Sequence, residues 1–277
     1  MLLRPASLTV FGCATLYAVG VGCGLTADFS NLQGGARDSG AQLDVAAPDA
    51  PSTDASSPAD ASSGFCASLQ TTPKLCRDFD EGAAVGSGWT QLDVYNAPDL
   101  ALDTSIFTSS PASFLSSMTT ASGSPASARL LESLPVLAPS VHAEFQMLLP
   151  SGGGPYELFA IHEVTQDGST YGVFYKLING NLSLYVGTLG DDGGLIANTY
   201  PLGPPPATWL HVEMDVEISD TASITVKHDG AVVVSETNVP TATHSRQTLF
   251  AELGFYSFTA ATARVNFDDV VIDWPSL

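Results

Sequence analysis

Apolar and polar side chains alternate along much of the second half of the chain. The clearest case is residues 141–149, where Val141, Phe145 and Leu149 point one way and His142 and Glu144 point the other. Successive side chains of a strand point to opposite faces of a sheet, so this period of two predicts a strand with one buried face.

A hairpin is predicted further along. Two apolar runs, 171–178 and 182–186, flank the dipeptide Asn179-Gly180, which favours the two-residue turn between paired antiparallel strands. Further strands are predicted over residues 113–120, 157–164, 210–218, 224–228, 232–235, 249–258 and 264–273. Because no helical periodicity separates these strands, the sequence predicts an all-β, antiparallel two-sheet sandwich or jelly roll.

The N-terminal segment has the pattern of an export signal. Arg4 precedes an apolar run that ends at Cys23 and is shorter than the roughly 20 residues of a membrane-spanning helix. Residues 20–23, Gly-Val-Gly-Cys, resemble a lipobox, although Gly20 stands where Leu is usual. The resemblance implies a signal peptide over 1–22 and a lipid on Cys23. The alternatives are cleavage near Ala27 and an uncleaved signal.

A spacer follows this signal. From Asp38 to Gly64, 21 of 27 residues are Ala, Ser, Asp or Pro, a composition that cannot form a core. We therefore expect a disordered linker over 23–64 and one folded domain over 65–277. The residue after Cys23 is Gly24, where some lipoproteins have Asp. In this respect the chain resembles lipoproteins of the bacterial outer membrane, which face either the periplasm or the outside.

The charge of the chain excludes one class of partner. It carries 29 acidic and 9 basic side chains, a formal net charge of −20, and the basic residues are scattered singly. Nucleic acid binding needs clustered cations, so it is not expected. The same charge disfavours anionic polysaccharides unless calcium bridges them, and makes neutral glucans the better first candidates.

Four cysteines support export. Cys13 would leave with the signal and Cys23 would carry lipid, which leaves Cys66 and Cys76. In an oxidising compartment these two are expected to form a disulfide.

Three stretches carry a family resemblance. They are residues 75–82 (LCRDFDEG) followed by Gly88-Trp89, residues 209–216 (WLHVEMDV) leading to Asp229-Gly230, and residues 265–273 (VNFDDVVID). In this order they resemble concanavalin A-like, laminin-G-like jelly-roll domains of secreted bacterial proteins. The resemblance implies that fold together with polysaccharide or cell-surface glycan as partner. It does not fix an activity, because this fold hosts binding modules and enzymes alike.

An acidic strand suggests one alternative function. Glu213, Asp215 and Glu217 resemble the E-x-D-x-E strand of family 16 glycoside hydrolases. Glycosidases that retain the configuration of the cleaved sugar have their two working carboxyls about 5 to 5.5 Å apart. The motif order differs from that family, however, because these acids lie inside the block that begins at Trp209. The simpler interpretation is a solvated strand face.

A calcium site is a further expectation. In many jelly-roll carbohydrate-binding modules an acid of the opening segment and an Asp of the closing strand hold a structural Ca²⁺, which here implies Asp80 and Asp268. Asp269 would fall on the apolar face of the closing strand unless a cation or a bulge accommodates it. The alternatives are a salt bridge to Arg77 or Arg264, or a hydrogen-bonded Asp at a strand end.

The sequence thus favours a lipid-anchored, non-catalytic polysaccharide-binding domain. A glycosidase using Glu213 and Glu217, and a structural or adhesion module that binds an envelope protein, are the alternatives. Sugars stack on aromatic rings, and the candidate rings are those of Tyr156, Tyr171, Tyr175, Tyr185 and Tyr200. Each of these tyrosines could equally belong to the core, so the sequence nominates no binding face.

Overall fold

The computed structural model describes residues 64–80, 84–96, 98–119, 125–151, 155–166, 168–189, 195–242, 246–257 and 262–276. The predicted signal segment, Cys23 and nearly all of the predicted linker lie outside these residues, so the predictions made for them stay predictions. Within the described ranges, no helix has both the length and the apolar character that crossing a membrane requires.

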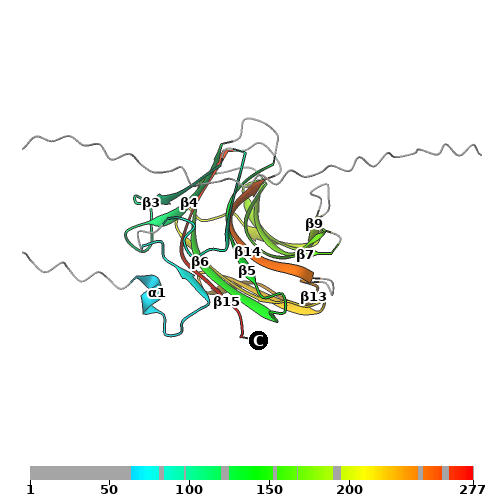
Figure 1. Cartoon of the computed structure of the whole chain (residues 1–277). Coiled ribbons are helices and arrows are strands. Elements are labelled where there is room, and N and C mark those ends of the chain that lie inside the picture. The colour runs from blue at the N-terminus through cyan, green and yellow to red at the C-terminus, as the bar shows by residue number, and fades with distance from the viewer. Residues whose placement is uncertain are drawn as a thin grey trace, which may run out of the picture. The chain divides into compact units, whose positions relative to one another are not determined.

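The described part of the chain is built of two antiparallel sheets, as the sequence predicted (Figure 1). The first sheet has eight strands, with β1 paired to β15 beside the main order β13-β12-β11-β6-β15-β4-β3. Its strands are β1 (Leu75–Arg77), β3 (Pro98–Asp103), β4 (Ser113–Thr119), β6 (Ser140–Ser151), β11 (Leu210–Glu217), β12 (Ala222–His228), β13 (Ala231–Val239) and β15 (Thr262–Asp273).

The second sheet has seven strands in the order β10-β9-β8-β7-β14-β5-β2. It is curved, as the ribbons of β7 and β9 show in Figure 1. Its strands are β2 (Gln91–Tyr95), β5 (Ala126–Leu134), β7 (Tyr156–Thr165), β8 (Thr170–Ile178), β9 (Asn181–Leu189), β10 (Leu195–Gly203) and β14 (Arg246–Ser257). One short helix, α1 (Phe65–Ser68), precedes both sheets.

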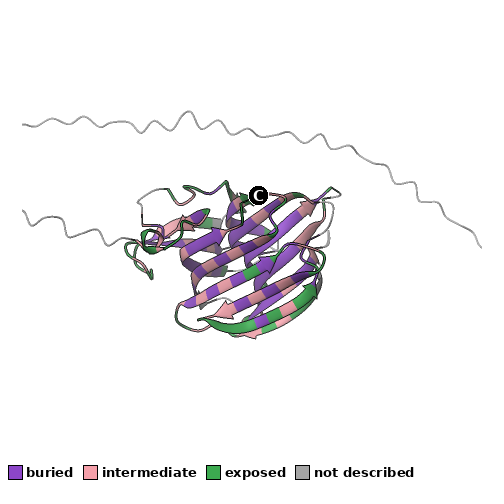
Figure 2. Cartoon of the chain, turned by 90° about the horizontal axis from the view of Figure 1, so that it is seen from below, coloured by how far each residue is buried: buried purple, intermediate pink, exposed green. Residues whose placement is uncertain are grey.

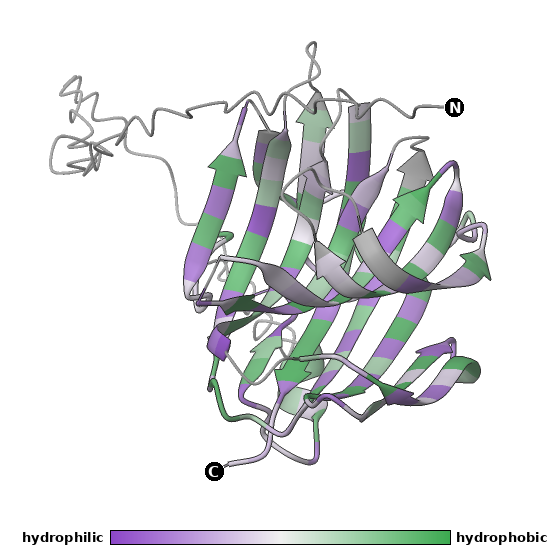
Figure 3. Cartoon of the chain, turned by 90° about the vertical axis from the view of Figure 1, so that its right-hand side faces the viewer, coloured by the Kyte–Doolittle hydropathy of each residue, from purple (hydrophilic) through white to green (hydrophobic). Residues whose placement is uncertain are grey.

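Strand β6 shows why the alternation of apolar and polar residues predicted strands correctly. Val141, Phe145 and Leu149 are buried, whereas His142 and Glu144 are half-buried on the opposite face. The same alternation runs along neighbouring strands, as buried and half-buried bands in Figure 2 and as hydropathy bands in Figure 3. The polar faces of these strands point away from the opposite sheet.

The predicted hairpin is present as β8 and β9. Ile178 pairs with Asn181 across the turn, and Asn179 and Gly180 both have positive φ, 51° and 76°. This is the backbone geometry that a two-residue turn of this kind requires, and few residues other than Asn, Asp and Gly adopt it easily.

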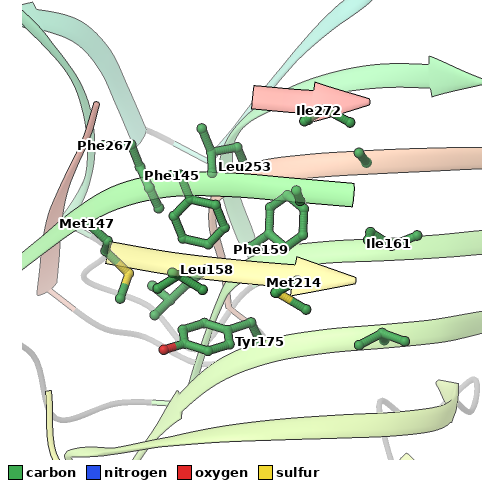
Figure 4. Packing of buried hydrophobic residues seen from close by; sticks show 14 of the residues in the cluster. Phe145, Met147, Leu158, Phe159, Ile161, Tyr175, Met214, Leu253, Phe267 and Ile272 are labelled. Carbon is green, nitrogen blue, oxygen red and sulfur yellow. The ribbon is translucent and has the colours of Figure 1, made fainter. Parts of the chain in front are cut away.

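Aromatic rings join the two sheets into one core (Figure 4). The ring of Phe145 on β6 lies 5.1 Å from that of Phe159 on β7 and 5.8 Å from that of Phe267 on β15. Tyr175 on β8 meets Phe145 edge-on. All four rings are at most 1% exposed, so the inner faces of both sheets are fixed by close packing.

The pattern did not predict five of the strands: β1, β2, β3, β5 and β10. Strand β1 has three residues, and β2 is an edge strand on which Leu92 and Val94 remain about half exposed. Alternation is a weak signal in strands that are short or lack a clear buried face.

The predicted disulfide between Cys66 and Cys76 is confirmed, with an S–S distance of 2.07 Å. It ties α1 to β1, and the backbone N–H of Cys66 donates to the Asp78 carboxylate at 3.1 Å. The segment before the sandwich is thereby attached to β15, because β1 pairs with that strand.

We predict that the variant Cys66→Ala/Cys76→Ala loses about 2 to 3 kcal/mol of unfolding free energy, the chain-entropy value for a loop of about 11 residues. Urea denaturation of the oxidised wild type and of the variant measures this difference. Reductant should lower wild-type stability and leave the variant unchanged. Equal stability of the two proteins would mean that the unfolded chain gains little freedom when the bond is absent.

Candidate functional site

The predicted acidic strand lies on the outer face of the eight-stranded sheet. The Glu213 carboxylate accepts from Lys227 Nζ at 2.7 Å, Asp215 Oδ1 lies 2.8 Å from His142 Nδ1, and Glu217 accepts from the backbone N–H of Ser223 at 2.8 Å. On the opposite face, Val212, Met214 and Val216 are buried. The three acids therefore occupy a partly solvated strand face, each with a partner on a neighbouring strand, and a catalytic role for them stays a prediction.

One histidine on this face is held in its charged form. Hydrogen bonds to Glu144 and Asp215 raise the pKa of His142 to about 9, against the opposing effect of its partial burial. At neutral pH the imidazolium therefore compensates part of the negative charge of this face.

The acids proposed for calcium each accept a hydrogen bond from the protein. Asp268 is fully buried and its Oδ2 accepts the backbone N–H groups of Thr108 and Ser109 at 2.7 and 3.0 Å. Asp80 instead accepts the N–H of Ala112 at 3.3 Å. Among the described residues there is no group of three or more His, Cys, Asp or Glu side chains that could hold a metal ion. A calcium site at Asp80, Asp268 and Asp269 stays a prediction.

A bulge accommodates the Asp pair of the closing strand. The register of β15 against β6 shifts between Asp268 and Val271, and Asp269 has a φ of 51°. This is one of the two ways in which the sequence allowed Asp269 to avoid the apolar face. Of the predicted salt-bridge partners, Arg264 instead pairs with Asp103.

A site that the sequence did not nominate lies on the outer face of the seven-stranded sheet. Ala160 on β7 is opposite Glu252 on β14 and opposite Phe174 on β8. His162, two residues further along β7, therefore points to the same face, while Phe159 and Ile161 point into the core.

Buried charges gather on this face around Arg129 of β5. Arg129 Nε and Nη2 contact Asp93 Oδ2 at 3.1 and 2.6 Å. Its Nη1 pairs with the Glu252 carboxylate and lies 3.6 Å from Glu157 Oε1. Glu157 in turn lies 3.4 Å from Lys176 Nζ. We call these five residues, which come from five strands, the Arg129 network.

Burial controls the protonation of this network. The Glu252 and Glu157 side chains are only 5% and 6% exposed. Burial raises the pKa of Glu252 to about 7, although Arg129 acts in the opposite direction. A proton therefore joins or leaves this carboxyl near neutral pH.

His162 is enclosed by aromatic rings on the same face. Its ring is 6.2 Å from that of Phe174, nearly parallel, and 5.8 Å from that of Phe250. Burial lowers the pKa of His162 to about 4, so the imidazole is neutral at pH 7. Its Nε2 lies 3.6 Å from Glu252 Oε1, and its buried Nδ1 makes no hydrogen bond with any residue that the structure describes.

These groups surround a pocket of 160 Å³, which we call the network pocket. It is lined by Arg129, Glu157, His162, Thr170, Phe174, Glu252 and Tyr256. The Tyr256 ring lies 4.6 Å from the Arg129 guanidinium carbon, and Lys176 Nζ lies 5.0 Å from the Phe174 ring. Two larger pockets, of 300 and 280 Å³, are lined by no Phe, Tyr or Trp side chain.

Two glycines let the strands approach each other beside the network pocket. A Cβ on Gly172 of β8 would lie 2.3 Å from the carbonyl oxygen of Ile161. A Cβ on Gly254 of β14, where φ is +128°, would lie 2.2 Å from the carbonyl oxygen of Ala128. Both positions therefore require glycine, and a glycine inside a strand was the available sequence signal for a close backbone approach here.

The candidate tyrosines separate into two groups. Tyr156 and Tyr175 are buried in the core. Tyr185 is opposite Phe174 in the β8–β9 pairing, and so lies on the outer face of the seven-stranded sheet, 5.7 Å from Lys176 Nζ. Tyr171 and Tyr200 are half-buried.

Comparison with known proteins supports the fold. No family model matches the chain, and no curated protein matches it. An endo-β-1,4-glucuronan lyase from the fungus Trichoderma reesei is similar in structure, with 13% identity, a TM-score of 0.58, and 73% of this chain and 95% of that chain covered. The cellulose-induced protein Cip1 follows, with 14% identity, a TM-score of 0.51, and 72% and 96% covered.

Alginate lyase A1-II′, of polysaccharide lyase family 7, is a more distant neighbour, with 17% identity, a TM-score of 0.45, and 62% and 83% covered. The likeness to the first two structures and the two antiparallel sheets of the chain itself confirm the predicted all-β, two-sheet jelly-roll fold. At such low identities the likeness shows the fold alone.

We predict that Glu252 makes the protein less stable as the pH rises from about 4.5 to 7. Its raised pKa means that the folded state binds the proton more tightly than the unfolded chain, so the stabilisation is complete below pH 4.5 and is lost by about pH 7. The loss is on the order of 3 kcal/mol, at about 1.4 kcal/mol per pKa unit.

Urea denaturation of the wild type and of Glu252→Gln across this range measures the effect. The variant should gain stability relative to the wild type as the pH rises. A difference between the two proteins that stays constant with pH would contradict the prediction.

Proposed function

We propose that this chain is a polysaccharide-binding lipoprotein that binds a glycan at the network pocket without cleaving it. The observation that carries the proposal is the combination of buried carboxylates and aromatic rings around one 160 Å³ pocket. One solved structure of similar fold bears the name of a glucuronan lyase, an enzyme that acts on a polysaccharide, which supports a carbohydrate as the partner.

The groups of the pocket match the chemistry of a sugar. The apolar face of a pyranose packs against an aromatic ring, which Tyr256 supplies. Sugar hydroxyls donate hydrogen bonds, and charged acceptors such as the carboxylates of Glu157 and Glu252 make the strongest of these. Since Arg129 and Lys176 already hold the carboxylates in place, little order has to be created on binding.

Binding without cleavage is favoured by the state of the titratable groups. A general base works best when its pKa lies near the working pH, whereas the pKa of His162 is lowered to about 4. Glu157 lies 3.6 Å from Arg129 Nη1 and 3.4 Å from Lys176 Nζ, so its carboxylate is already engaged by two groups of the protein.

One observation favours hydrolysis as a second candidate function. Glu157 and Glu252 both approach Nη1 of Arg129, so their carboxyls lie close together, and the pKa of Glu252 is raised to about 7. A carboxyl that is protonated near neutral pH beside an ionised one is the arrangement of a glycosidase. The same assay must therefore measure binding and bond cleavage.

We predict that the full chain, purified in detergent, is retarded in native gels that contain a neutral polysaccharide, with no new reducing or unsaturated ends. Tyr256→Leu should weaken retardation about 5-fold or more, because a stacking ring is lost from the pocket. Phe107→Leu is the matched control, since Phe107 is an exposed ring on the loop before β4.

If the wild type produces new reducing ends and Glu252→Gln does not, the protein is a hydrolase that acts at the network pocket. If Glu213→Gln is the variant that produces none, the acidic strand β11 carries the hydrolysis instead. The absence of retardation with every polysaccharide would favour a structural or adhesion module that binds an envelope protein.

The lipid anchor has its own test. We predict that cells fed labelled palmitate incorporate label into the wild-type protein and not into Cys23→Ser, and that the variant leaves the membrane fraction. Cys13→Ser is the control, because Cys13 lies inside the predicted signal. Label retained by Cys23→Ser would contradict the lipobox assignment.

A further inference from the structure

We propose that the network pocket is a selective site for an uncharged sugar ring and excludes uronic acids, because the Arg129 network already occupies the cation that a sugar carboxylate would need. The inference rests on the proposed function and specifies its ligand class.

Arg129 already has a protein carboxylate beside each nitrogen of its guanidinium. A guanidinium recognises a carboxylate through two parallel N–H bonds. Here Nε and Nη2 both contact Asp93 Oδ2, and Nη1 pairs with Glu252. All three nitrogens of the side chain are therefore engaged by carboxylates of the protein itself.

The balance of charge points in the same direction. Above pH 7, where Glu252 is ionised, the network contains three carboxylates, Asp93, Glu157 and Glu252, against the two cations Arg129 and Lys176. Lys176 also has a carboxylate partner, Glu157, at 3.4 Å. The carboxylate of a uronic acid would be the fourth in a largely buried site, and like charges placed together in this way are strongly unfavourable.

The site provides hydrogen-bond acceptors, an aromatic ring and a small volume. Glu157 and Glu252 line the pocket, and Tyr256 supplies the ring of a half-buried tyrosine. The pocket of 160 Å³ is smaller than the roughly 300 to 1,000 Å³ that enclose drug-sized ligands. A single ring that donates hydroxyl hydrogen bonds and carries no charge fits these three properties.

Pairs of probes that differ only in charge test the proposal. Neutral oligosaccharides with β-1,4-glucan, β-1,3-glucan and mannan backbones are each compared with their C6-oxidised forms, in which a carboxylate replaces the CH₂OH group. Binding to the full chain is measured by isothermal titration at low salt, where electrostatic effects are least screened.

The expected result is that at least one neutral oligosaccharide binds and that its oxidised form binds at least about 10-fold more weakly. Asp93→Asn removes one carboxylate from Arg129 and should reduce this ratio to about 3-fold or less by strengthening binding of the oxidised form. Asp99→Asn is the matched control, because Asp99 is an exposed carboxylate on β3 of the other sheet. It should keep the wild-type ratio.

Each other result overturns one statement. If the oxidised form binds the wild type as tightly as its neutral parent, selection against uronic acids is wrong while the proposed glycan binding stands. If Asp93→Asn keeps the wild-type ratio and melts at the same temperature as the wild type, the Arg129 network does not cause the selection against uronic acids. If Asp93→Asn melts at a lower temperature, Glu252→Gln provides the same comparison. If no form of any oligosaccharide binds, the proposed function itself fails.

Discussion

The pairing of Arg129 with the carboxylates around it is the interaction on which the outer face of the seven-stranded sheet depends. Burying one unpaired charge costs several kcal/mol, so each member of this network would be strongly destabilising alone. Together they are tolerated, because every cation has a carboxylate within reach and Arg129 alone contacts three. The network therefore fixes the relative positions of five strands on the face that lies away from the core.

Close packing underneath makes this precision possible. Phe159 and Tyr175 hold β7 and β8 against Phe145 of the other sheet, and these rings leave almost no exposed surface. The strands that carry Glu157 and Lys176 cannot shift without disturbing that core, since one residue of slippage would turn each side chain to the opposite face. The inner face of the sheet thus determines the geometry of its outer face.

The fold could be predicted from the sequence, whereas the network pocket could not. Alternation in β6 and the Asn179-Gly180 turn are local signals, and both were confirmed. Strand β7 has no alternation to detect, because nine of its ten residues are buried, charged ones included. Asp93, Arg129 and Glu252 come from distant parts of the sequence, and only the strand order β14-β5-β2 brings them together. No spacing rule along the chain connects them.

The acids of the two outer faces differ in how clearly they appear in the sequence. Glu213, Asp215 and Glu217 stand out because alternation places them on one face of one strand, yet alternation with a polar face is what a partly solvated strand produces. Their partners lie on the adjacent strands β6 and β12, and Asp215 is more than half exposed. Glu157 and Glu252 are inconspicuous in the sequence because their neighbours are apolar, and for the same reason they are buried in the protein. Burial raises the pKa of Glu252, makes its partner Arg129 unavailable to other anions, and so gives this face the chemical selectivity that an exposed row of carboxylates lacks.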